Sequence, residues 1–253
     1  MAKHTNRYDN ENLINLAKQD YESKKQSTIP SEIVSLVSEG KVYPKNHPLR
    51  PGKIEMRYMT AYDEDILTNA SYIKEGVVLE RLIQALIVSD IDYNEIAQVD
   101  KDGLILSARI LSYGAEYPVR VVDPKTKKYV DRVVDLSKLQ TKTIDLKPDD
   151  RGEFIYESEK HLLKFKFPTT TELGDNNTIS SFLQNTITEI DGKRKKSDIE
   201  HFIQYEFLAL DSKQFQKYLI ENTPTMLLEY EFEGENGSTF SSGFPIGPDF
   251  FWP

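Results

Sequence analysis

Cysteine is absent from the 253 residues of this sequence. Its absence excludes disulfides, a thiolate nucleophile, an iron–sulfur cluster and a zinc site with thiolate ligands. Positive charge is also scarce, because 32 lysines and arginines face 41 aspartates and glutamates, and the formal net charge is −9. Nucleic acids and anionic membranes attract cationic surfaces, so this balance argues against both as partners.

Long apolar runs are missing as well. Residues 85–88 form one of the longest, whereas a membrane-spanning helix needs about 20 apolar residues. Residues 1–6 contain no apolar segment that could act as a signal peptide. The 14 tyrosines and 12 phenylalanines nevertheless supply enough aromatic side chains for a folded core. We expect a folded protein of a cytosol, or of a particle assembled there.

The first third of the chain combines short helices with one strand. Residues 9–26 carry a weak apolar stripe, and we assign residues 1–28 to a polar N-terminal arm. Residues 54–58 alternate apolar and polar side chains as a strand does. Thr60, followed by acidic residues three and four positions later, predicts a helix start. Residues 79–87 predict an amphipathic helix, because their leucines and isoleucines recur at helical spacing.

A third helix is predicted to begin near Asp100, whose carboxylate would cap it. Its apolar positions are Leu104, Ala108 and Leu111, and Gly114 stands where a left-handed residue ends many helices. Beyond this glycine the apolar residues alternate, which indicates strands. The predicted elements that follow are hairpins over residues 117–134 and 154–167, helices over 178–222 interrupted at 192–197, and a last hairpin over 228–246.

These blocks predict an α+β protein, in which helical blocks are combined with antiparallel β-hairpins. A parallel doubly wound sheet is not expected, because strands and helices do not alternate one by one. We expect three parts: the arm over residues 1–28, a helix-plus-hairpin domain over 29–167, and a helical region over 168–253 that is closed by a C-terminal hairpin and an aromatic tail.

Acidic clusters do not form a convincing catalytic or metal site. Residues 63–65 are three adjacent carboxylates, but neighbours on a helix point in different directions, so capping of the helix is the favoured interpretation. Residues 90–94 match the first ligand positions of a calcium loop. The sixth and twelfth positions of that loop should be glycine and glutamate, and here they are Glu95 and Lys101. This segment is therefore predicted to be a turn between helices.

The histidines lack the spacing of metal ligands. They are His4, His47, His161 and His201, and we expect each to be structural or exposed. We accordingly predict no enzyme, no cofactor and no metal. One enzymatic alternative is a hydrolase whose site is assembled from His161, Asp191, His201 and Glu206.

Residues 193–196, Lys-Arg-Lys-Lys, are the one basic run of the chain. Asp191 and Asp198 flank it, and the first aromatic residue downstream is Phe202. Nucleic-acid binding needs interleaved aromatic residues or a broader basic face. A solvated turn between helices is therefore the favoured interpretation.

Apolar side chains crowd the last ten residues. Two interpretations are open: the tail docks on its own fold, which we favour because termini are often held by a sheet, or it anchors a partner, because aromatic residues dominate interface energetics. The candidate partner-binding residues are Phe244, Ile246, Phe250, Phe251 and Trp252.

The order of these features resembles the baseplate hub and hub-assembly proteins of T-even-like contractile-tailed bacteriophages. The segments that carry the resemblance are residues 29–31 (IPS), 56–67 (MRYMTAYDEDIL), 109–114 (RILSYG), 135–137 (DLS) and 245–251 (PIGPDFF).

The resemblance implies a non-enzymatic structural or assembly protein of the tail baseplate. Its partners would be other phage tail proteins. It would be located in the baseplate of the virion, or in the host cytoplasm during assembly. A tail-assembly chaperone that is absent from the mature virion is an alternative of the same kind.

Overall fold

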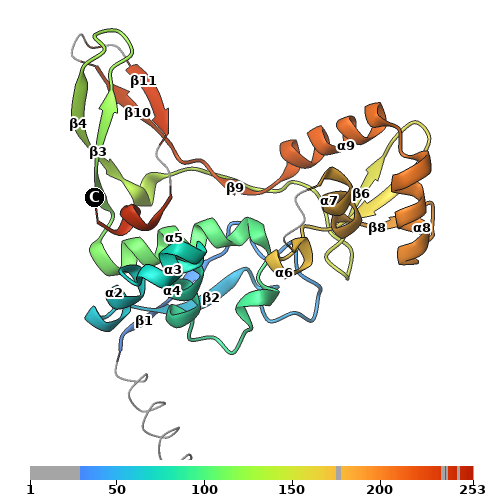
Figure 1. Cartoon of the computed structure of the whole chain (residues 1–253), viewed down its shortest axis with the longest axis horizontal. Helices are drawn as coiled ribbons and strands as arrows, with labels where there is room; N and C mark the ends of the chain where they lie inside the picture. Colours follow the sequence, from blue (N-terminus) through green and yellow to red (C-terminus); the bar gives the residue numbers. More distant parts are fainter. Residues whose placement is uncertain (1–28, 175–177, 235–236, 238, 244–245, 253) are drawn as a thin grey trace, which may run out of the picture.

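The computed structural model describes residues 29–174, 178–234, 237, 239–243 and 246–252. The predicted arm over residues 1–28, with its helix, lies outside the described residues. Figure 1 shows a lower helical body, two hairpins that rise from it, and a second lobe beside it. All strand pairs of the described residues are antiparallel, so the predicted α+β class is confirmed.

The body combines a two-stranded sheet with four helices. Its strands are β1 (Ser31–Ser35) and β2 (Lys53–Arg57), which confirms the strand predicted at residues 54–58. The side chains of Leu82, Ile83 and Leu86 are at most 1 % exposed, so the helix predicted at residues 79–87 packs its apolar face as expected. The helices are α2 (Ala61–Leu67), α3 (Ala70–Glu75), α4 (Val78–Leu86) and α5 (Gln98–Tyr113).

Asp100 does not cap α5, contrary to the prediction. The N-cap residue is Ala97, and Asp100 lies in the first turn with its carboxylate buried. The carboxylate accepts hydrogen bonds from the Ser38 amide (2.7 Å), the Ser38 hydroxyl (2.8 Å) and the Tyr43 hydroxyl (2.7 Å). Local spacing could not reveal this role, because the donors lie more than fifty residues away in the sequence. Asp100 thus ties the loop between β1 and β2 to α5.

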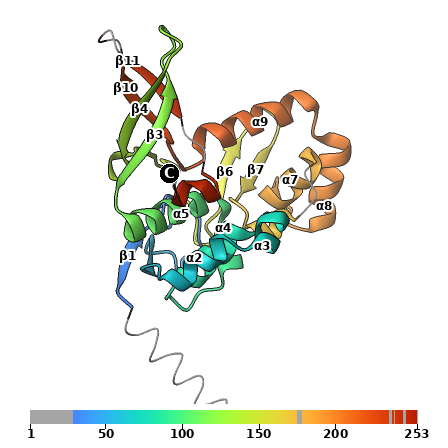
Figure 2. The same ribbon diagram turned by 60° about the vertical axis from the view of Figure 1, so that its left-hand side comes forward.

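Two hairpins stand side by side above the body (Figures 1 and 2). One confirms the prediction for residues 117–134, and the other confirms the pairing predicted within residues 228–246. Val121, Val130 and Phe232 are buried, while the Arg132 guanidinium donates to the Glu233 carbonyl oxygen over 2.7 Å. The strands are β3 (Glu116–Val122), β4 (Tyr129–Asp135), β10 (Glu229–Glu233) and β11 (Thr239–Gly243).

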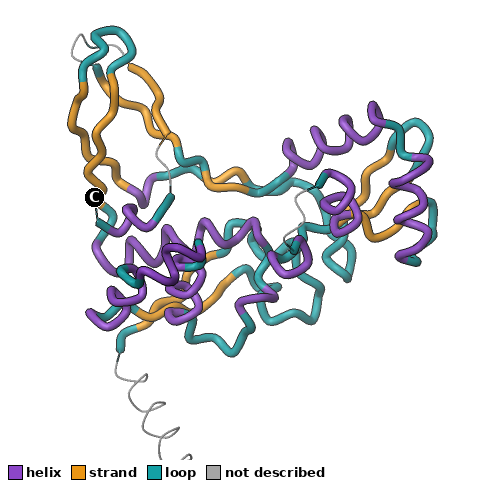
Figure 3. Tube along the Cα trace, viewed as in Figure 1, coloured by secondary structure: helices purple, strands orange, loops and turns teal. Residues whose placement is uncertain are grey.

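The outer lobe, residues 154–222, contains a three-stranded sheet in the order β6-β7-β8 with helices packed around it (Figure 3). The hairpin predicted at residues 154–167 is confirmed. Residues 187–190 form a strand where the sequence predicted a helix. Their isoleucines are three positions apart, which is helical spacing, and both face the core of a strand only because the register between β7 and β8 shifts there. The elements are β6 (Phe154–Glu157), β7 (Leu162–Phe165), β8 (Ile187–Ile190), α7 (Ile179–Thr186), α8 (Lys196–His201) and α9 (Ala209–Asn222).

The outgoing and returning connections between the body and the outer lobe run through two short strands. Strand β5 (Thr141–Lys142) pairs with β9 (Thr225–Met226), so the outgoing and returning segments lie side by side. Helix α6 (Thr170–Leu173) lies near the junction of the body and the outer lobe, which we call the seam. The domain boundary predicted between residues 167 and 168 falls between β7 and α6 and stays a prediction. None of the described helices combines the length and apolar character needed to cross a bilayer.

Candidate functional site

The C-terminal segment packs against the body at the base of the hairpins. A short 3-10 helix, η4 (Pro248–Phe251), buries Phe250 and Phe251, each only 1 % exposed. The Phe250 ring centre lies 4.9 Å from that of Tyr117. Docking of these two phenylalanines on their own fold therefore agrees with the favoured interpretation of the tail.

The five residues predicted to bind a partner have different surroundings. Phe250 and Phe251 are buried, Ile246 packs half-buried against the core, and Trp252 is 42 % exposed. Phe244 lies outside the described residues. Partner binding through this segment stays a prediction, and Trp252, which directly follows η4, is left accessible by the fold.

Arg109 on α5 holds the tail in place. Its guanidinium, which is buried, donates to the carbonyl oxygens of Phe250 (3.2 Å) and Gly114 (3.1 Å). It also lies over the rings of Tyr113 and Tyr117 at 5.0 and 5.7 Å. Burial lowers the pKa of Arg109 from its ordinary value. No local pattern indicates this contact, because Arg109 and Phe250 are 141 residues apart in the sequence.

The hairpin β3–β4 presents an exposed apolar face. Strand register places Val122 opposite Tyr129, and Pro118 opposite Val133. Tyr129 and Val133 are 73 % and 60 % exposed, and Val122 is 45 % exposed. Between these pairs, Arg120 binds the Asp131 carboxylate at 2.7 Å. We call this surface the hairpin face (Pro118, Arg120, Val122, Tyr129, Asp131 and Val133). Clustered apolar side chains on a projecting element are typical of interaction sites.

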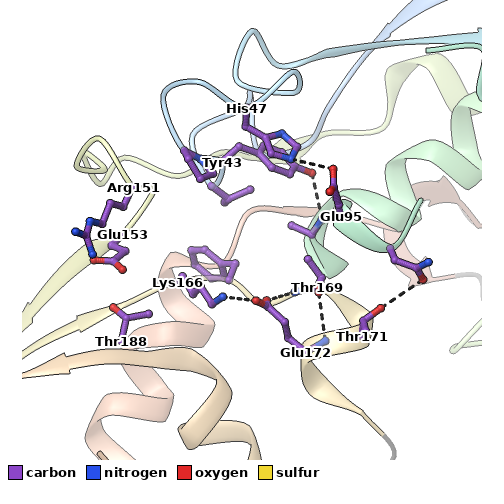
Figure 4. Close-up of a pocket in the computed structure, with 15 residues that line it drawn as sticks. Tyr43, His47, Glu95, Arg151, Glu153, Lys166, Thr169, Thr171, Glu172 and Thr188 are labelled. Atoms are coloured by element: carbon purple, nitrogen blue, oxygen red, sulfur yellow. Dashed lines mark hydrogen bonds and ion pairs between the residues drawn. The ribbon is translucent and has the colours of Figure 1, made fainter. Parts of the chain in front are cut away.

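A second feature is an open pocket of about 550 Å³ between the body and the outer lobe (Figure 4). Tyr43, His47 and Glu95 line it from the body. The opposite wall includes Glu153 and Lys166, whose charges are already paired: Glu153 with Arg194, and Lys166 with Glu172. Both ion pairs lie within this wall, so they fix its side chains in place.

His47 is held as a neutral structural residue in this pocket. Its Nδ1 accepts a hydrogen bond from the Leu49 amide at 3.1 Å, and its ring stacks on Tyr43 with centres 4.8 Å apart. Burial lowers the pKa of His47. The Glu95 carboxylate, which lies 3.7 Å from Nε2, acts to raise this pKa, but burial has the larger effect. The structural role expected for this histidine is therefore observed.

The four residues of the hydrolase alternative form two separate pairs. His161 Nδ1 lies 2.9 Å from the Asp191 carboxylate, and His201 Nδ1 lies 3.1 Å from the Glu206 carboxylate. Among the residues that the structure describes, no hydrogen bond or ion pair joins one pair to the other. The side chains of Asp191, His201 and Glu206 are 45–63 % exposed. The geometry gives the hydrolase alternative no support.

The other predicted clusters serve the fold. The Asp63 carboxylate caps α2 together with Thr60, as predicted, and also binds Arg57. In the basic run, Arg194 binds Glu153 and Glu189 at 2.5 and 2.7 Å. That run connects a strand to a helix rather than two helices, because β8 replaces the predicted helix. No group of three potential metal ligands occurs in the described part of the chain.

Comparison with known proteins gives one match. A family model described as "T4 bacteriophage base plate protein" matches residues 13–242. No curated protein and no solved structure matches the chain. The matched range contains the body, both hairpins apart from the last residue of β11, and the outer lobe, so the comparison concerns nearly the whole fold.

Proposed function

The chain belongs to the family of T4 bacteriophage base plate proteins, and from that premise we propose that it is a non-enzymatic structural or assembly protein of the baseplate hub. It acts through contacts with other tail proteins, in the virion baseplate or in the host cytoplasm during assembly. The hairpin face supports this proposal, because it projects from the body with exposed apolar side chains. The family match is the observation that carries it.

The first experiment is deletion of the gene for this protein in the phage. Without the protein, complete baseplates should not form, and the purified protein should co-purify with other tail proteins from infected cells. Normal baseplates in the deletion strain would contradict the proposal. Mass spectrometry of purified virions then separates the two roles, because a structural component is present in the particle and an assembly chaperone is absent.

A second experiment addresses the hairpin face. Replacing Tyr129 and Val133 together by serine removes exposed apolar surface, so the yield of baseplates should fall while the melting temperature stays within about 2 °C. Tyr62→Ser is a matched control, because Tyr62 is 79 % exposed on α2, away from the hairpin. An unchanged yield with the double variant, or an equal loss with the control, would contradict a specific role of this face.

A further inference from the structure

The outer edge of strand β1 is open. This strand pairs with β2 on one side and with no other strand in the part of the chain that the structure describes. All of its residues except Val34 are exposed, and Ile33 keeps 70 % of its surface. Figure 2 shows β1 at the margin of the body. An exposed strand edge is a template for pairing with another strand.

The hydrogen bonds between β1 and β2 show which backbone groups this edge presents. The Tyr58 amide donates to the Pro30 carbonyl oxygen, and the Leu36 amide donates to the Gly52 carbonyl oxygen, both at 2.9 Å. Along an antiparallel pair, residues alternate between bonding to the paired strand and pointing away from it. The even-numbered residues from 30 to 36 therefore bond to β2, and the odd-numbered residues of β1 direct their N–H and C=O groups outward.

The far edge of β2 has the same alternation, but its outward groups are occupied. The Glu55 carbonyl oxygen accepts from the Val88 amide at 2.9 Å, and the Glu55 amide donates to the Ser89 hydroxyl at 2.9 Å. Among the described residues, the outward backbone groups of β1 have no such partner. The open edge of this sheet is therefore β1, and the complement of its unpaired groups is an extended strand.

The sequence of β1 is nearly symmetrical about Ile33. It reads Ser-Glu-Ile-Val-Ser. When a second β1 runs antiparallel with its Ile33 opposite this one, Ser31 lies opposite Ser35, and Glu32 lies opposite Val34. This register places odd-numbered residues opposite one another, so their outward groups form the hydrogen-bonded pairs of the new ladder. No charged side chain of one strand directly faces a like charge on the other, which would be destabilising.

We propose that two copies of this chain associate through β1. Their strands pair about a two-fold axis at Ile33, and the two separate two-stranded sheets become one continuous antiparallel sheet in the order β2-β1-β1-β2. The exposed Ile33 side chains meet at the axis. A self-complementary contact of this kind is typical of two-fold dimers, and the symmetry of the strand favours a second copy over an unrelated strand.

The absence of cysteine allows a direct test of this register by disulfide trapping. Hydrogen-bonded antiparallel residues have Cα atoms about 5.5 Å apart, a separation that a disulfide spans. Under mild oxidation, full-length Ile33→Cys should form covalent dimers. Ser31→Cys alone is the control, because the two copies of this position lie about 14 Å apart along the strands. A mixture of Ser31→Cys and Ser35→Cys should form mixed dimers, because these positions face each other.

A second test removes one outward amide. Ile33→Pro lacks the N–H group at the axis, but β2 does not use that group, and proline is tolerated on such an edge. Analytical ultracentrifugation should show dimers of the wild type at high concentration and only monomers of Ile33→Pro, with unchanged circular dichroism. Ile33→Val is the control, because it keeps the amide and a β-branched side chain, and it should still dimerise.

Two results would overturn the proposed dimer: equal crosslinking of Ile33→Cys and Ser31→Cys, or a wild type that stays monomeric at every concentration. The photo-crosslinker p-benzoylphenylalanine at position 33 then identifies the occupant in infected cells. Crosslinks to a second copy are expected. Crosslinks only to another tail protein, or only to residues 1–28 of the same chain, would refute the second copy and assign the edge to that segment. The deletion strain tests the proposed function separately, so that function stands or fails independently of the dimer.

Discussion

Two buried carboxylates on neighbouring elements show how residue surroundings set opposite electrostatic behaviour. Burial raises the pKa of Asp100, although the hydrogen bonds from Ser38 and Tyr43 oppose it. Burial also acts to raise the pKa of Asp63, but the hydrogen bonds from Arg57 and Thr60 outweigh it, so the net pKa is lowered. The difference arises because a guanidinium faces Asp63, whereas only neutral donors face Asp100.

Asp63→Asn should destabilise the protein by about 3 kcal/mol at pH 7, because it leaves the nearly buried Arg57 guanidinium without its charged partner. A lowered carboxyl pKa stabilises the fold above the pKa of the unfolded chain, about 3.9, and this contribution is lost as the pH falls through the folded value. The difference in free energy of unfolding between wild type and Asp63→Asn should therefore become smaller below about pH 4. Urea denaturation of both proteins at pH 7 and pH 3 measures this difference.

Asp65→Asn is the control for that substitution, because Asp65 is exposed on the same helix. Its effect should stay below about 0.5 kcal/mol at both pH values. A constant difference between wild type and Asp63→Asn across the acid range would show that the ion pair does not set the pKa of Asp63.

Two glycines with positive φ angles should respond differently to alanine. At Gly40 (φ +79°) an added Cβ would lie 2.3 Å from the Arg50 carbonyl oxygen, whereas at Gly76 (φ +73°) nothing lies within 4 Å. Gly76→Ala should cost about 1 kcal/mol, the strain of a left-handed alanine. Gly40→Ala should cost at least about 2 kcal/mol more, because backbone must move. Urea denaturation of both variants tests this, and equal losses would contradict it.

At the scale of elements, the C-terminal 3-10 helix should act as part of the core. Phe250→Ala removes a 1 % exposed ring packed on Tyr117, so it should cost about 3–5 kcal/mol and lower the melting temperature by about 10 °C. Trp252→Ala, at a 42 % exposed position, should cost less than about 1 kcal/mol. Thermal denaturation followed by circular dichroism compares them. A Phe250→Ala melting curve that matches wild type would mean that the tail contributes nothing to the fold.

Elements specified by local pattern were predictable, and those specified by distant partners were not. The spacing of Leu82, Ile83 and Leu86 identified α4 because a helix buries every third or fourth residue. The roles of Asp100 and Arg109 depend on donors and acceptors far away in the sequence, so no local pattern could indicate them. The strand over Ile187–Ile190 was missed because its two buried isoleucines are three positions apart, which is helical spacing, and the register shift that places both on one face of the strand has no local signal.

The candidate sites follow the same division. Side chains along the hairpin β3–β4 alternate between its two faces, so the sequence predicts that every second position is exposed. It does not predict which apolar residues gather on the outer face. The pocket of Figure 4 was not predictable, because its walls come from segments that only the tertiary fold brings together. The aromatic tail was evident in the sequence, whereas the contact of Phe250 with Tyr117 required the structure.

At the scale of the whole molecule, one buried cluster continues from the body into the outer lobe. It includes Leu82 and Leu104 in the body and Phe154, Phe165 and Phe215 in the outer lobe. A core shared by the body and the outer lobe favours cooperative unfolding of the two parts. The backbone connects them near β5 and β9 and through the segments beside α6. Phe167 lines the pocket between the body and the outer lobe. Its ring packs on the outer-lobe core, with centres 5.5 Å from Phe154 and 5.8 Å from Phe165.

The two parts should therefore unfold together in the wild type and separately once the seam is weakened. Trp252, the single tryptophan, reports on the body by its fluorescence, while circular dichroism at 222 nm reports on helices of both parts. In the wild type both signals should give one melting temperature. Phe167→Ala opens the seam at an 8 % exposed position, so the dichroism should begin to fall at a lower temperature than the fluorescence.

Ile220→Ala is the control, because Ile220 is 72 % exposed on the outer lobe, and this variant should keep the two melting temperatures equal. Separate transitions in the wild type would contradict the cooperative unit, because they would show that the shared core does not couple the lobes.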